Sequence, residues 1–311
     1  MVVAVFRRRC ARPLGDNDPR PIGMFDSGGG GLTVARSMLE MLPHQSLIYV
    51  ADTARFPYGH RSMADIRRYA LEITDVLLHR DIKMLVVACN SAEACAMDDI
   101  ASRCPVPLVG VINPTVAAAI RATRNGVIGL IGTEATVRSG AYDRAIEATG
   151  ADVVVHSKGC PGLGELAHRD GTTSTQLSQT IRRFLAPLKA KKIDTLILGC
   201  TAYPLISTFL QMEVGSDVAL VSSAEETANE VYAILTDTEL EGEQSSPRQH
   251  EFLVTGDSRQ FQRLVSVLMG TLSGKYVIRP VLPAPSSRFR QEDFCVGAFT
   301  EAVEVEGGRS P

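Results

Sequence analysis

The sequence predicts an α/β fold of two similar lobes, each a mostly parallel sheet flanked by helices, related by pseudo-two-fold symmetry. Two observations predict it: short apolar runs alternate with segments of helical period, and one such unit recurs along the chain. Continuous apolar strands that alternate with helices are typical of parallel sheets covered on both faces. The 311 residues, 45% of them hydrophobic, suffice for one large or two ordinary domains.

Short runs of aliphatic and β-branched residues that end in small or polar residues are expected to be strands. They are residues 21–25, 46–52, 84–89, 108–112, 126–132, 152–157 and 195–200. Residues 63–80 place their apolar side chains on one face of a helix. Residues 251–270 predict a further strand, an N-cap at Asp257 and an amphipathic helix.

An internal repeat relates the two halves of the chain. MLVVACNSA (84–92) resembles TLILGCTAY (195–203): a buried strand, a cysteine, a small polar residue and a helix. The segments 21–34 and 126–139 repeat a strand, a polar loop and a helix at a similar spacing. Ligands of open α/β sheets bind beyond the carboxyl ends of the strands, so two facing lobes would bring Cys89 and Cys200 to one cleft.

Composition suggests the domain boundaries. Residues 1–20, rich in Arg, Pro and Asp, are expected to be a flexible N-terminal segment. Residues 281–311, with Pro, Ser, Gly and charges, are expected to be a partly disordered C-terminal extension. We expect the first lobe to comprise residues 21–112 plus 222–280, and the second lobe residues 113–221.

Charge and cysteine usage exclude several classes of protein. The net charge of −3 gives no basic excess, so no nucleic-acid or membrane partner is expected. The first apolar stretch precedes a basic cluster, the reverse of a signal peptide, and no run approaches the roughly 18 apolar residues of a membrane span. Seven cysteines without a C-x-x-C pair argue against a disulfide scaffold and against a metal site. These features predict a cytoplasmic protein.

FDSGGGG (25–31) follows an expected strand and opens a helix. Backbone N–H groups of such a loop can bind an anion, but the segment matches neither a Walker loop nor the dinucleotide-binding pattern. Asp26 would repel an anion there. A tight strand–helix turn, in which glycine permits close packing, is an equal alternative. PYG (57–59) is by itself an ordinary turn.

Cys89 and Cys200 are the stronger chemical signal, because their context is repeated. A thiol at a strand end beside a helix N-terminus is expected to have a lowered pKa, which makes it a usable base or nucleophile. Moving a proton from one face of a tetrahedral carbon to the other needs two such groups, one on each side. A small buried hydrophobe is the favoured interpretation for the remaining candidates, Cys95, Cys104, Cys160 and Cys295.

Together these segments resemble glutamate racemase, of the cofactor-independent aspartate/glutamate racemase superfamily. The resemblance rests on FDSGGGGLTV (25–34), DTARFPYG (52–59), VVACNSA (86–92), SGAY (139–142), LGCTAYPL (198–205) and FLVTGDSRQF (252–261). It implies two facing lobes with the active site and an amino-acid substrate between them. It also implies direct deprotonation at Cα without pyridoxal phosphate or another cofactor, and a homodimer.

The resemblance carries site residues over by position. Cys89 and Cys200 match the paired acid–base residues, each serving one enantiomer, and Asp26 matches the carboxylate that assists the first cysteine. Residues matching those around the carboxylates and ammonium of the substrate are Ser27, Pro57, Tyr58, Gly59, Asn90, Ser91, Thr133, Thr136 and Thr201.

Two positions depart from the family pattern. The family usually has a His directly after Cys-Thr, where this chain has Ala202; that His is thought to tune the second cysteine. The family also places a Glu some residues after a Cys-Pro pair. Here Glu165 comes three residues earlier and His168 occupies the expected position, and either could assist Cys200.

The resulting hypothesis is a racemase that interconverts L- and D-glutamate for peptidoglycan. Ala202 leaves a second one open, a same-fold isomerase acting on aspartate or on a glutamate-like biosynthetic intermediate. A third is a weakly catalytic regulator, since some glutamate racemases bind and inhibit DNA gyrase. Two reactive thiols argue against the third hypothesis, because a pure binding protein has no need of them.

Overall fold

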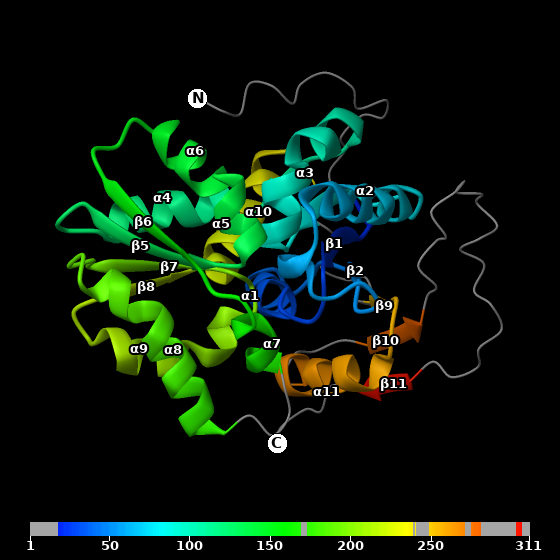
Figure 1. Ribbon diagram of the computed structural model, residues 1–311. Coiled ribbons are helices and arrows are strands. Elements are labelled where there is room, and N and C mark those ends of the chain that lie inside the picture. Colours follow the sequence, from blue (N-terminus) through cyan, green and yellow to red (C-terminus); the bar gives the residue numbers. More distant parts are fainter. Residues whose placement is uncertain are drawn as a thin grey trace.

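Two sheets frame the computed structural model, which describes residues 18–168, 173–238, 240, 249–270, 275–280 and 303–306. One has seven strands in the order β11-β10-β9-β2-β1-β3-β4, and the other has four in the order β6-β5-β7-β8. Figure 1 shows the four-stranded sheet on the left and the strands of the seven-stranded sheet on the right. We call each sheet with its covering helices the first and the second lobe, respectively.

The first lobe contains both the first and the last of the described strands. Its strands are β1 (Ile22–Asp26), β2 (Leu47–Ala51), β3 (Met84–Val87), β4 (Leu108–Gly110), β9 (Gln249–Val254), β10 (Lys275–Pro280) and β11 (Val303–Glu306). Its helices are α1 (Leu32–Met41), η2 (Tyr58–His60), α2 (Met63–Leu78), α3 (Asn90–Arg103), α10 (Ser223–Asp237) and α11 (Ser258–Met269). All pairings are parallel except that of β10 with β11.

The second lobe is an entirely parallel unit. Its strands are β5 (Val127–Gly132), β6 (Val154–Gly159), β7 (Thr195–Gly199) and β8 (Ala219–Ser222). Its helices are α4 (Ile112–Ala122), α5 (Glu134–Ser139), α6 (Ala141–Glu147), α7 (Leu163–His168), α8 (Ser174–Lys189), η3 (Tyr203–Ile206) and α9 (Ser207–Val214).

The strand orders confirm the predicted duplication. The run β2-β1-β3-β4 of the first sheet has the same order and direction as the whole second sheet, β6-β5-β7-β8. In each unit the first strand lies inside the sheet, the second strand pairs on one side of it, and the third and fourth strands follow on the other side. Every strand expected from the sequence is present, whereas β8, β10 and β11 were not expected.

The predicted helix features are also present. α2 buries Ile66, Ala70 and Ile73 on its apolar face, and Asp257 caps α11 by accepting the backbone N–H of Arg259. Among the described residues, no helix combines the length and apolar character needed to cross a membrane. Residues 1–17 of the expected N-terminal segment and most of residues 281–311 lie outside the described residues.

A shared hydrophobic core joins the lobes. One cluster of buried residues includes Met24 and Val86 from the first sheet, Ile128 and Ile197 from the second, and Ala228 of α10. The lobes therefore bury apolar surface against each other as well as internally. This shared burial fixes the position of one sheet relative to the other.

Candidate active site

The functional side chains lie where strands end. Asp26 is the last residue of β1, Cys89 follows β3 as the N-cap of α3, Thr133 follows β5 as the N-cap of α5, and Cys200 follows β7. Carboxyl ends of parallel strands meet at one edge of a sheet. Because the lobes face each other, these two edges meet in one pocket, which all four residues line.

The pocket brings together every sequence-predicted site residue except Thr136. Those lining it are Asp26, Ser27, Pro57, Tyr58, Gly59, Cys89, Asn90, Ser91, Thr133, Glu165, His168, Cys200 and Thr201. Thr136 is buried and does not line the pocket. Its hydroxyl lies 3.0 Å from that of Thr133 and 3.3 Å from that of Ser91, so it supports two residues that do line the pocket.

The Cys89 thiol is buried and touches the carboxylate of Asp26. Burial raises the pKa of this thiol well above its usual range, and the negative charge of Asp26 raises it further. The backbone N–H groups of Ala92 and Ser27 act in the opposite direction. The lowered pKa predicted from the helix N-terminus is therefore wrong, because desolvation outweighs the donated hydrogen bonds.

The pKa of the Cys200 thiol is also raised and not lowered, although its surroundings differ from those of Cys89. Burial raises its pKa to about 12, and the charges of Asp26 and Glu165 add to the effect. Among the described residues, one hydrogen-bond donor lowers it, the backbone N–H of Ala202. Burial thus favours the thiol form of both cysteines at neutral pH.

The glycine-rich loop positions Asp26 and permits the lobes to approach. The N–H of Gly31 donates to Asp26 Oδ2 at 2.9 Å. A Cβ on Gly30 would lie 2.8 Å from the backbone nitrogen of Ala202, in the other lobe. The N–H of Gly31 is thus already bonded to the carboxylate of Asp26, and Gly30 allows the two lobes to pack closely. Both observations favour a tight strand–helix turn over an anion-binding site.

Hydroxyl groups connect the lobes on both sides of the pocket. Ser91 Oγ lies 2.9 Å from Thr133 Oγ1, and Thr33 Oγ1 on α1 lies 3.0 Å from the carbonyl oxygen of Thr201. Asn90 donates from Nδ2 to the Tyr142 hydroxyl at 2.8 Å. Its Oδ1 is buried and has no hydrogen-bond partner within the described part of the chain. Such neutral groups can bind a carboxylate without the fixed charge of Arg or Lys.

The two candidates for assisting Cys200 differ in their surroundings. Glu165 Oε1 lies 2.7 Å from Nε2 of His60, so this carboxylate is engaged by the first lobe. Burial lowers the pKa of His168, which lies edge-on to the Phe56 ring and whose Nδ1 has no partner among the described residues. Ala202, where the family has His, is buried.

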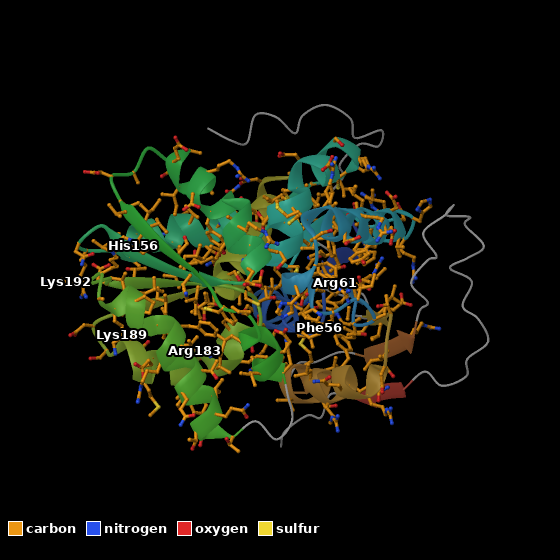
Figure 2. The ribbon with its side chains drawn as sticks, viewed as in Figure 1. Phe56, Arg61, His156, Arg183, Lys189 and Lys192 are labelled. Atoms are coloured by element: carbon orange, nitrogen blue, oxygen red, sulfur yellow. The ribbon has the colours of Figure 1, made fainter. Side chains whose placement is uncertain are left out.

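Several lining residues escaped the sequence analysis. They are Gly30, Phe56, His60, Glu134, Cys160, Pro161, Gly162 and Gly164, besides Ala202. Phe56 and His60 flank the PYG motif, which is the signal that could have found them. In Figure 2, Phe56 and Arg61 mark this loop at the centre of the molecule, where the lobes meet. Cys160 is buried as expected, yet it also lines the pocket.

Comparisons with known proteins agree with this geometry. A family model described as Asp/Glu/Hydantoin racemase matches residues 22–231. The glutamate racemase of Saccharopolyspora erythraea is 45% identical over 267 residues, covering 86% of this chain and 98% of that protein. The motif-based resemblance is thereby confirmed.

Solved structures extend the agreement to three dimensions. The structure of a glutamate racemase isoform from Bacillus anthracis has a TM-score of 0.80 at 37% identity, covering 84% of this chain and 97% of that one. The structure of glutamate racemase from Francisella tularensis in complex with D-glutamate has a TM-score of 0.77 at 27% identity, covering 86% and 98%. Both confirm the predicted fold class.

Proposed function

Because the chain belongs to the Asp/Glu/Hydantoin racemase family, we propose that it interconverts L- and D-glutamate by direct proton transfer at Cα, without a cofactor. The observation that carries the proposal is the position of Cys89 and Cys200 at equivalent strand ends of two facing lobes, both lining one pocket. The names of the similar proteins, and the D-glutamate in the F. tularensis structure, support glutamate as the substrate.

The proposed reaction has two proton transfers. One cysteine, as thiolate, removes the Cα proton, and the electron pair of the C–H bond passes to the carbanion that the adjoining carboxylate delocalises. The other cysteine, as thiol, donates its proton to the opposite face. One thiolate has become a thiol and the other thiol a thiolate, so charge and protons balance, and the two enantiomers use the cysteines in opposite roles.

The raised thiol pKa values fit this scheme if the substrate itself activates the site. Asp26 touches Cys89 and can take the thiol proton. The ammonium group of an amino acid adds a positive charge that stabilises both a carboxylate and a thiolate nearby. Burial thus favours the protonated form of both thiols, and the charge of the bound substrate favours the release of one proton.

Neutral donors are proposed to hold the substrate's carboxylates. Asn90, Ser91, Thr133 and Thr201 line the pocket from both lobes, together with Ser27. No Lys or Arg is among the lining residues within the described ranges. A cytoplasmic location, a supply of D-glutamate for peptidoglycan and a homodimeric assembly belong to the same proposal and rest on the likeness to glutamate racemases alone.

The test is hydrogen exchange at Cα. The protein is incubated with L-glutamate and, separately, with D-glutamate in D₂O without pyridoxal phosphate, and the α-proton is followed by NMR. Loss of the signal from both enantiomers is expected. No exchange from either would contradict glutamate as the substrate, and aspartate would be the next amino acid in the same assay.

The cysteine roles are tested by substitution. Cys89→Ala and Cys200→Ala are each expected to lower racemisation by about a thousandfold or more, because general acid–base groups contribute roughly 10²–10⁴-fold and both are required. Cys95→Ala is the matched control: this partly buried thiol packs on the core outside the pocket. Full activity in either of the first two variants would contradict the two-base scheme.

A further inference from the structure

A histidine and two glutamates from opposite lobes meet at the rim of the pocket. His60 ends η2 in the first lobe, and its Nε2 lies 2.7 Å from Oε1 of Glu165 on α7. Its other ring nitrogen, Nδ1, lies 4.0 Å from Oε2 of Glu134 on α5. All three line the pocket, and their side chains are 46%, 34% and 48% exposed in the order named here. We call this group the rim bridge.

The rim bridge ends on the helix that covers the second cysteine. A Cβ added to Gly164 of α7 would lie 3.8 Å from Cys200 Sγ. Glu165 is the next residue, so whatever holds Glu165 also holds this part of α7 over the thiol. α7 is only six residues long, and a helix of that length has little stability without contacts to its surroundings.

The loop that carries His60 also contacts the second lobe elsewhere, since the ring of Phe56 lies edge-on to His168 of α7. A Cβ on Gly59 would lie 2.9 Å from Cβ of Thr133, so the backbone of η2 packs closely against the N-cap of α5. The rim bridge adds a hydrogen bond between this loop and α7. Two contacts on different elements fix the orientation of a loop in a way that one contact does not.

We propose that His60 is a positioning residue for the reaction: by binding Glu165 across the mouth of the pocket, it holds α7 closed over Cys200, and substrate enters and product leaves when this bridge opens. The inference rests on the proposed function. It assigns Glu165 to closure of the pocket, acting through His60, and not to proton transfer with Cys200.

The chemistry of the group suits a contact that opens in every turnover. Two carboxylates of the second lobe flank one imidazole of the first lobe, which can donate a hydrogen bond to one of them. Exposed pairs of this kind contribute little to stability, since water and salt screen them. A weak bridge biases the pocket toward closure without trapping the product.

A double-mutant cycle in the full chain tests the coupling. His60→Ala and Glu165→Ala are each expected to lower kcat/KM for glutamate by about two- to fivefold, mainly through a higher KM, as loss of one weak hydrogen bond predicts. The double variant is expected to lose no more than the stronger single variant. Fully additive losses would overturn the proposal, because two independent residues give that result.

The conservative variant separates closure from catalysis. Glu165→Gln keeps an oxygen that accepts from His60 but cannot exchange a proton, so it is expected to recover most of the activity lost in Glu165→Ala. A loss of a hundredfold or more in Glu165→Gln would assign Glu165 to proton transfer and contradict the proposal.

Amide hydrogen exchange measures closure without any substrate, so it stands even if glutamate proves not to be turned over. In His60→Ala and in Glu165→Ala, the peptide covering Leu163–His168 is expected to exchange at least threefold faster than in the unsubstituted chain. Arg121→Ala is the matched control, since Arg121 pairs with Glu226 at 2.8 Å between α4 and α10, and neither residue lines the pocket. Unchanged exchange of α7 in both rim variants would overturn the proposal.

Discussion

The two cysteine sites occupy equivalent places in a duplicated unit, yet their surroundings differ. Cys89 caps a 14-residue helix and touches the carboxylate of Asp26. Cys200 is followed by a turn and a 3₁₀ helix, and the carboxylates of Asp26 and Glu165 act on it only through their charge. The duplication has thus kept the strand order and the position of the thiol, whereas the groups that surround each thiol differ.

The local sequence explains the difference. After Cys89, the residues from Asn90 onward continue directly into α3. After Cys200, Pro204 lies in the first turn of η3, where its ring removes an N–H donor, and the α-helix begins only at Ser207. Cys89 receives the backbone N–H of Ala92 from α3 and that of Ser27 from the glycine-rich loop, whereas Cys200 receives that of Ala202.

The largest expected effect would sharpen this comparison. Asp26→Asn is expected to lower kcat for glutamate about 10²–10³-fold, because it removes the carboxylate that touches Cys89. Glu165→Gln is expected to cost less than tenfold, since Glu165 does not touch Cys200 directly. Steady-state rates for both enantiomers measure the two variants, and equal losses would contradict the asymmetry. Thermal unfolding is the control, because an Asn oxygen can still accept from Gly31.

Sequence patterns predicted the parts of the site that depend on local order. Strands that end in Asp26, Cys89 and Cys200 were visible as apolar runs, and parallel pairing then requires their ends to converge. The thiol pKa values were predicted in the wrong direction, because a helix N-terminus is visible in the sequence but the depth of burial is not. The contact of His60 with Glu165 joins residues 105 positions apart, and no local pattern indicates it.

The missed strands have similar reasons. β8 has only four residues, of which Val221 alone is buried. Its short apolar run, VALV (218–221), cannot be distinguished from a helical segment by periodicity alone. β11 lies within residues 281–311, whose composition predicted an extension with disorder, yet its four residues pair with β10 at the edge of the sheet. Edge strands depend on pairing with a neighbour more than on their own composition.

An intermediate effect is expected where the lobes touch beside the second cysteine. A Cβ on Gly30 would lie 2.8 Å from the backbone nitrogen of Ala202 and 2.9 Å from Thr201 Oγ1. Relieving the first contact requires the backbone to shift, which costs more free energy than rotating a side chain. Gly30→Ala is therefore expected to lower kcat/KM by about tenfold and the free energy of unfolding by about 1–3 kcal/mol.

Gly29→Ala is the matched control for that substitution. Its nearest obstacle, at 2.5 Å, is Cδ1 of Leu264, the far end of a side chain that can rotate. The two variants are compared by activity assay and urea unfolding. A larger activity loss in Gly29→Ala than in Gly30→Ala would show that the contact with Ala202 is not what limits the site.

A buried carboxylate near Cys89 has no counterpart at the equivalent position near Cys200. Glu93, on α3 three residues after Asn90, accepts the backbone N–H groups of Val111 and Ile112 where the chain crosses from β4 into α4. The corresponding residue after Cys200 is Pro204. Burial raises the pKa of Glu93 from 4.5 to about 7, against the lowering effect of its two donors.

The smallest expected effect follows from that pKa. Between pH 4.5 and about 7, folded Glu93 keeps a proton that the unfolded chain has released, so its contribution to the free energy of unfolding falls as pH rises through this window. Glu93→Gln removes the titration while keeping an acceptor for both N–H groups. The stability of the variant relative to the unsubstituted chain is therefore expected to increase between pH 5 and pH 8, by on the order of 2 kcal/mol. Urea unfolding at the two pH values measures this difference, in which the other titrating groups cancel. A difference that stays constant with pH would mean that Glu93 ionises with equal ease in the folded and unfolded chain, and that the crossing between the lobes is insensitive to pH.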